Sequence, residues 1–135
     1  MRYEDERMTK KVMVVDDDVG VIYTVKHGIE GSDSEYEVIT VESGEKCIAL
    51  LEDDQIPDLI LLDIMMPGMS GWEAYQKIRA NEAWKNIPVV FLSARTDRIA
   101  KDAGGFLGDD YIEKPFKVPE LKARIDKILK KFEDK

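Results

Sequence analysis

Short apolar segments that each end at a polar or charged side chain constrain the fold of this chain more than any other feature. They lie at residues 12–15, 59–62, 89–92 and 111–112, and a further strand-like segment spans residues 36–41. Unbroken apolar runs of this length are typical of strands that are covered on both faces of a parallel sheet. Helical patterns separate these segments, so the sequence predicts an α/β domain with five parallel strands.

The stretches between the predicted strands favour helices with recognisable ends. The first helix is expected to end near residues 28–31, where glycines occur. Ser43 and Ser70 each stand where a helix N-cap is expected, directly before an apolar helical pattern. We expect the helix after Ser70 to reach Trp84, and the last helix to run from Pro119. Strands and helices therefore alternate, five of each.

The fourth of these helices, at residues 97–106, has the weakest pattern. Gly104 and Gly105 interrupt it, and glycine costs about 1 kcal/mol relative to alanine inside a helix. We therefore expect this helix to be short and mobile.

Length, composition and charge limit the classes of protein to which the chain can belong. Its 135 residues, of which 44% are hydrophobic, suit one domain; residues 1–9 are expected to form a flexible N-terminal extension and residues 10–135 the domain. The net charge of −8 argues against direct nucleic-acid binding. The sequence has no apolar run long enough for membrane insertion and a single cysteine, Cys47, so a cytoplasmic location is expected.

Three further residues have simple structural interpretations. Asp18 is expected to cap the first helix, where a carboxylate also interacts favourably with the helix dipole. His27, the only histidine, is expected on the surface of that helix and away from the acidic residues. Cys47 is expected to be a small core residue.

Chemically active side chains stand where the predicted strands end. Asp16 and Asp17 follow the first strand, Asp63 the third, Ser93 the fourth and Lys114 the fifth. In an open parallel sheet these carboxyl ends border the functional crevice. Clustered carboxylates repel one another unless a positive charge lies between them, and Mg²⁺ prefers oxygen ligands in a shallow site. The pattern therefore predicts a site that uses Mg²⁺ and Lys114 to receive a phosphoryl group on Asp63, with a hydrogen bond from Ser93.

Four sequence motifs connect these residues to a known family. VMVVDDD, DLILLDIMMPGMSG, VVFLSA and DDYIEKPF, in this order, resemble the motifs of the receiver domain of two-component response regulators over about residues 10–133. The resemblance implies a doubly wound, flavodoxin-like five-stranded sheet of order 2-1-3-4-5 with helices on both faces.

The resemblance also implies a role for each matching residue. Asp63 is the implied phosphoacceptor and Asp17 a direct ligand of Mg²⁺, while Asp16 assists through a water or as a second ligand. The backbone carbonyl of Met65 is a further implied metal ligand.

Three implied roles concern the phosphoryl group and the switch. Ser93 and Lys114 bind the phosphoryl group, and the bond between Lys114 and Pro115 is expected to be cis. Tyr111 occupies the aromatic switch position, which turns inward when Ser93 is drawn toward the phosphate.

The implied function is a stand-alone receiver rather than an enzyme. A sensor histidine kinase or a histidine phosphotransfer protein would phosphorylate Asp63, slow autodephosphorylation would reverse the reaction, and an unknown downstream protein would bind the switched surface. A phosphorelay intermediate is an alternative.

A phosphatase of the haloacid-dehalogenase type needs a second acid two residues after the nucleophile, where Met65 stands. A pseudo-receiver without chemistry is disfavoured because every site residue is present, and a flavin phosphate would be repelled by Asp16 and Asp17.

Overall fold

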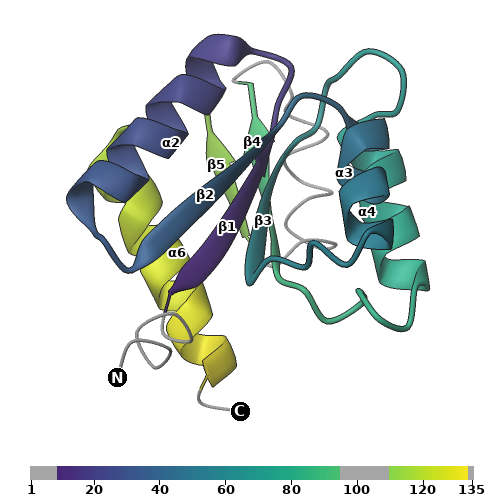
Figure 1. Ribbon diagram of the computed structural model, residues 1–135. Coiled ribbons are helices and arrows are strands. Elements are labelled where there is room, and N and C mark those ends of the chain that lie inside the picture. Colours follow the sequence, from purple (N-terminus) through teal and green to yellow (C-terminus); the bar gives the residue numbers. More distant parts are fainter. Residues whose placement is uncertain (1–8, 95–109, 134–135) are drawn as a thin grey trace.

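The computed structural model describes residues 9–94 and 110–133 (Figure 1). The extension predicted at residues 1–9 lies almost entirely outside these ranges, and so does the helix predicted at residues 97–106. The elements along the described chain are β1 (Lys10–Val15), α2 (Val19–Ser32), β2 (Tyr36–Val41), α3 (Gly44–Glu52), β3 (Leu59–Asp63), α4 (Gly71–Ala80), β4 (Val89–Ser93), β5 (Asp110–Glu113) and α6 (Val118–Glu133).

The five strands form one parallel sheet in the order β2-β1-β3-β4-β5, which confirms the predicted doubly wound fold. In this register Val15 is paired with Leu62, and Asp63 with Leu92. The carboxyl ends of β1, β3 and β4 therefore reach the same edge of the sheet, and the residues that follow them are brought close together.

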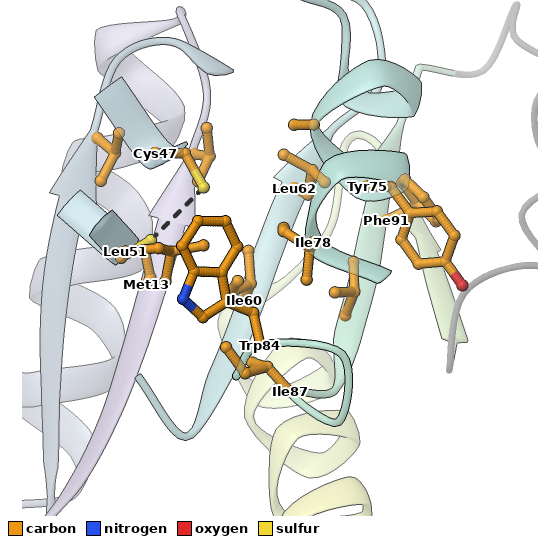
Figure 2. Packing of buried hydrophobic residues seen from close by; sticks show 14 of the residues in the cluster. Met13, Cys47, Leu51, Ile60, Leu62, Tyr75, Ile78, Trp84, Ile87 and Phe91 are labelled. Carbon is orange, nitrogen blue, oxygen red and sulfur yellow. Dashed lines mark hydrogen bonds between the residues drawn. The ribbon is translucent and has the colours of Figure 1, made fainter. Parts of the chain in front are cut away.

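Helices cover both faces of the sheet, α2 and α6 on one side and α3 and α4 on the other (Figure 1). Alternate residues of β1 divide between the two layers: Met13 and Val15 pack on the α3–α4 side, whereas Val12 and Val14 pack on the α2–α6 side. Figure 2 shows the α3–α4 side, where buried Cys47 lies with its Sγ 3.8 Å from the Sδ of Met13. Burial on both faces explains why these strands read as continuous apolar runs.

The predicted N-caps are confirmed at three helices. The Asp18 side chain accepts a hydrogen bond from the Gly20 N–H at the start of α2, and Ser43 accepts one from the Lys46 N–H in α3. Ser70 and Glu73 form a reciprocal capping box at the start of α4. Each cap ends the segment between a strand and the helix that follows it, so the caps help to fix these connecting segments. Within residues 9–94 and 110–133, no helix combines the length and apolar character that crossing a membrane requires.

One predicted helix end was wrong. The helix α4 ends at Ala80 rather than reaching Trp84, because Asn81 leaves the helical conformation and its side chain accepts a hydrogen bond from the Ala83 N–H. Trp84 is nevertheless buried in the α3–α4 layer (Figure 2). The helix α2 ends at Ser32, which agrees with the end predicted near residues 28–31.

Candidate functional site

Three carboxylates meet at the carboxyl edge of the sheet. Asp16 and Asp17 directly follow β1, and Asp63 is the last residue of β3. One ligand oxygen from each residue lies within 4.8 Å of the other two. Asp16 is 0% exposed and Asp63 4% exposed, whereas Asp17 is exposed. The cluster is therefore a partly buried acidic site that opens to solvent on the side of Asp17.

The Lys114 ammonium lies between the two buried acids. Its Nζ is 2.8 Å from Asp16 Oδ2 and 3.3 Å from Asp63 Oδ1. Lys114 follows β5, which pairs with β4 at the end of the sheet, so its side chain extends past β4 to the ends of β1 and β3. The expected cis bond between Lys114 and Pro115 is present.

Burial and like charge make the ionised form of Asp63 costly. Burial raises the pKa of Asp63 to about 7, and the neighbouring Asp16 carboxylate adds to this rise, while Lys114 partly opposes it. Burial by itself would lower the pKa of Lys114, but its hydrogen bond with Asp16 and the negative charge of Asp63 raise it above the usual value. One ammonium thus leaves the negative charge of the cluster only partly compensated.

This donor set fits a magnesium ion. Asp16, Asp17 and Asp63 offer oxygen ligands at mutually compatible distances, and a hard cation would supply the positive charge that Lys114 alone does not. The exposed side at Asp17 leaves room for the waters that Mg²⁺ retains.

The hydrogen bonds of Asp16 distinguish it from its two acidic neighbours. Its Oδ1 accepts the Asp18 N–H at 2.9 Å, and its Oδ2 accepts the Lys114 ammonium. Because both oxygens already have protein partners, Asp16 suits indirect participation in metal binding better than Asp17 does.

The structure places the remaining predicted residues less completely. Ser93 ends β4 and is paired in register with Glu113; its side chain lies outside the described part of the molecule. Tyr111 is paired with Phe91 and packs, half-buried, against the α3–α4 layer. Met65 has an exposed side chain in the loop after Asp63. The structure thus brings Asp16, Asp17, Asp63 and Lys114 together. The roles of these four residues, like those of Ser93, Tyr111 and Met65, stay predictions.

Two residues that border the site were not assigned to it from the sequence. The Gly71 N–H donates to the Ile64 carbonyl at 2.8 Å, and a Cβ at Gly71 would lie 2.2 Å from the Asp63 carbonyl oxygen. The glycine beside the Ser70 cap was a usable signal. Glu45 accepts a hydrogen bond from the Met69 N–H, a contact across 24 residues that no local pattern reveals.

Comparison with known proteins agrees with this fold. The family model of the response regulator receiver domain matches residues 12–126. The alkaline phosphatase synthesis transcriptional regulatory protein PhoP of Bacillus subtilis is 36% identical over 127 residues, which cover 93% of this chain and 51% of that protein. The chain thus spans about half the length of the curated relatives it matches.

Solved receiver structures resemble the chain over nearly their full length. A response regulator from Chloroflexus aurantiacus has a TM-score of 0.82 and 31% identity, with 90% of this chain and 98% of that chain covered. A CheY-like receiver domain protein from Methanospirillum hungatei has a TM-score of 0.78 and 35% identity, with 93% and 98% covered. The chain therefore belongs to the family of response regulator receiver domains of two-component systems.

Proposed function

We propose that the chain accepts a phosphoryl group on Asp63, assisted by Mg²⁺, from a phosphohistidine of a sensor kinase or a histidine phosphotransfer protein. The observation that carries this proposal is the Lys114 ammonium placed between Asp16 and Asp63 at the edge of the sheet. Such a cation, next to a carboxylate that faces a partly open acidic site, is suited to stabilise a transferring phosphoryl group.

In the proposed reaction an Asp63 oxygen attacks phosphorus and forms a P–O bond as the P–N bond of the donor breaks. The electron pair of that bond passes to the imidazole, which leaves as a neutral ring because its other nitrogen carries a proton in the phosphohistidine donor. Lys114 would interact with the phosphoryl oxygens. Ser93 ends the neighbouring strand β4, and we propose that it donates a hydrogen bond to them. Asp17, Asp63, the Met65 carbonyl and indirectly Asp16 would hold Mg²⁺, which would supply positive charge to the phosphoryl group during transfer.

The surface beside the site supports docking of a protein donor. Val19 and Tyr23 on α2 are 72% and 64% exposed, and α2 begins at Val19, two residues after Asp17. A cavity of about 550 Å³ also borders α2 and is lined in part by Val21, Lys114 and Phe116. An apolar surface next to the acceptor would let a partner bury area while it presents its phosphohistidine.

The output is proposed to be a shift between two conformations of the domain. Phosphorylation would draw Ser93 toward the phosphate and let Tyr111 turn inward, so that a downstream protein binds the altered surface. The half-buried position of Tyr111 opposite Phe91 supports such a movement. We propose a cytoplasmic receiver with slow autodephosphorylation, or a phosphorelay intermediate, whose switched surface is bound by another protein or domain.

Intact-mass spectrometry after incubation with acetyl phosphate tests the chemistry. We expect the mass of one phosphoryl group to be added to the wild type with Mg²⁺, and no addition with EDTA or in Asp63→Asn. Asp54→Asn, which changes an exposed acid on a distant loop, is the matched control and should be labelled normally. Labelling of Asp63→Asn to the wild-type extent would refute the assignment of the acceptor.

A further inference from the structure

We propose that Glu45 is a positioning residue that holds the loop of residues 64–70 against the start of α3 and so prepares the backbone after Asp63 for the metal. This inference rests on the proposed function, because the loop includes the predicted carbonyl ligand Met65. Glu45 itself lies in the first turn of a different helix and does not belong to the acidic cluster.

The contact joins α3 to the far end of the loop. Glu45 Oε2 accepts a hydrogen bond from the Met69 N–H at 3.0 Å. The helix backbone approaches the same residue, since a Cβ at Gly44 would lie 3.0 Å from the Met69 carbonyl oxygen. A charged acceptor strengthens a hydrogen bond to a backbone N–H. Met69 is therefore fixed both by a charged group and by close packing against the helix.

Gly68 lets the carboxylate reach the loop. Its φ is +74°, in the left-handed region that glycine adopts at little cost. A Cβ at this position would also lie 2.7 Å from Glu45 Oε2, which is shorter than a van der Waals contact allows. Both the conformation and the space at Gly68 thus fit the loop to the Glu45 carboxylate.

The other end of the loop is anchored to the acceptor strand. The Gly71 N–H donates to the Ile64 carbonyl, and Gly71 packs directly on the Asp63 carbonyl. Because Glu45 and Gly71 fix the loop between Asp63 and α4, the intervening Met65 backbone has less freedom to lose when a metal binds. Groups that orient metal ligands in this way influence metal affinity without touching the ion.

Two substitutions separate positioning from charge. Glu45→Ala removes the acceptor and the charge, whereas Glu45→Gln removes the charge and keeps an acceptor oxygen. Glu42→Ala is the matched control, because Glu42 is an exposed acid just before α3 whose ion pair is with Lys46, at 3.8 Å, and not with the loop. Gly68→Ala disturbs the same contact from the loop side and provides a second test.

The test uses two measurements. Calorimetry gives the Mg²⁺ dissociation constant of each variant, and NMR in EDTA gives the exchange rate of the Met69 amide proton. Glu45→Ala and Gly68→Ala should weaken Mg²⁺ binding about three- to tenfold and accelerate Met69 exchange. Glu45→Gln should stay within about twofold of the wild type in both measurements. Glu42→Ala should leave both unchanged.

Two results would overturn the inference. One is wild-type Mg²⁺ affinity in both Glu45→Ala and Gly68→Ala. The other is equal loss of affinity in Glu45→Ala and Glu45→Gln while Met69 stays protected in the Gln variant, which would assign the effect to charge alone. Failure of the proposed function would look different, because the wild type itself would then bind no Mg²⁺ and accept no phosphoryl group.

Discussion

Asp63 is almost fully buried, beside the buried Asp16. Among residues 9–94 and 110–133, Lys114 is the one cationic side chain that contacts both carboxylates. Ionising Asp63 in this setting costs folding free energy, which is the reason its pKa is raised. The same arrangement gives the site its affinity for cations, because a bound metal removes the repulsion. The arrangement that gives the site its chemistry thus lowers the folding stability of the metal-free domain.

Replacing Asp63 by Asn should therefore stabilise the metal-free domain. The folded-state pKa of Asp63 is about 7 against an ordinary value of 3.8, so the unfolded chain ionises this group first as the pH rises. The resulting loss of stability develops between about pH 4 and pH 7 and is complete above pH 7. In urea titrations with EDTA at pH 8, we expect Asp63→Asn to gain about 1–3 kcal/mol, with little gain at pH 4.

Asp17→Asn is the control for that experiment, because Asp17 is exposed and contributes less to the repulsion. Its gain at pH 8 should be clearly smaller. Saturating Mg²⁺ should narrow the gap between wild type and Asp63→Asn, since the metal stabilises only the state that binds it. A metal-free Asp63→Asn variant that is less stable than the wild type at pH 8 would contradict the electrostatic account.

At the scale of a single element, the residues of α3 stabilise its N-terminus but not its C-terminus. Ser43 caps its start and Glu45 places a negative charge in the first turn, where the helix dipole favours it. At its other end Asp53 is the C-cap and Asp54 follows with a φ of +63°. Both the left-handed backbone and the negative charge are unfavourable for Asp54 at this position.

Asp54→Gly should accordingly stabilise the domain. Glycine adopts the left-handed conformation readily after a helix C-terminus, and the change also removes a charge that opposes the dipole. We expect a gain of about 0.5–1.5 kcal/mol in thermal or urea unfolding. Asp54→Asn isolates the charge and should give part of the gain; no gain in either variant would show that the turn tolerates Asp54 without cost.

The individual helices and strands show which structural features could be predicted from the sequence. Strand positions and N-caps depend on residues close together in the chain, such as Asp18 with Gly20, and were predicted correctly. The end of α4 was wrong because Trp84 shares the apolar character of the helix while Asn81 breaks its backbone pattern. The link between Glu45 and Met69 depends on how two layers of the structure meet, and local patterns do not contain that information.

Across the whole described molecule, the site depends on how the segment after β1 and the segment after β5 are held together. Asp16 and Asp17 precede α2, and Lys114 precedes α6, so the packing of these two helices sets where the acids and the ammonium meet. The family motifs could place these residues on strand ends, but not the spacing between the helices. That spacing rests on a close approach of Gly28 in α2 to Val118 in α6.

Gly28→Ala should destabilise the domain although alanine is the better helix former. A Cβ at Gly28 would lie 2.6 Å from one methyl carbon of Val118 and 2.9 Å from the other, so α2 and α6 must separate. Overpacking of this kind costs about 1–3 kcal/mol, which exceeds the propensity gain of about 1 kcal/mol. Gly31→Ala in the same helix is the control. Its Cβ would meet nothing within 4 Å, so this substitution should stabilise the domain.

Adding Val118→Ala to Gly28→Ala removes the two methyl groups that the new Cβ would meet. If the helix spacing is the cause, the double variant should recover stability relative to Gly28→Ala in urea titrations, and the two changes should be non-additive. Since α6 begins four residues after Lys114, the recovery should extend to Mg²⁺-dependent labelling by acetyl phosphate. Additive losses from the two substitutions would instead place the effect of Gly28 outside the contact between α2 and α6.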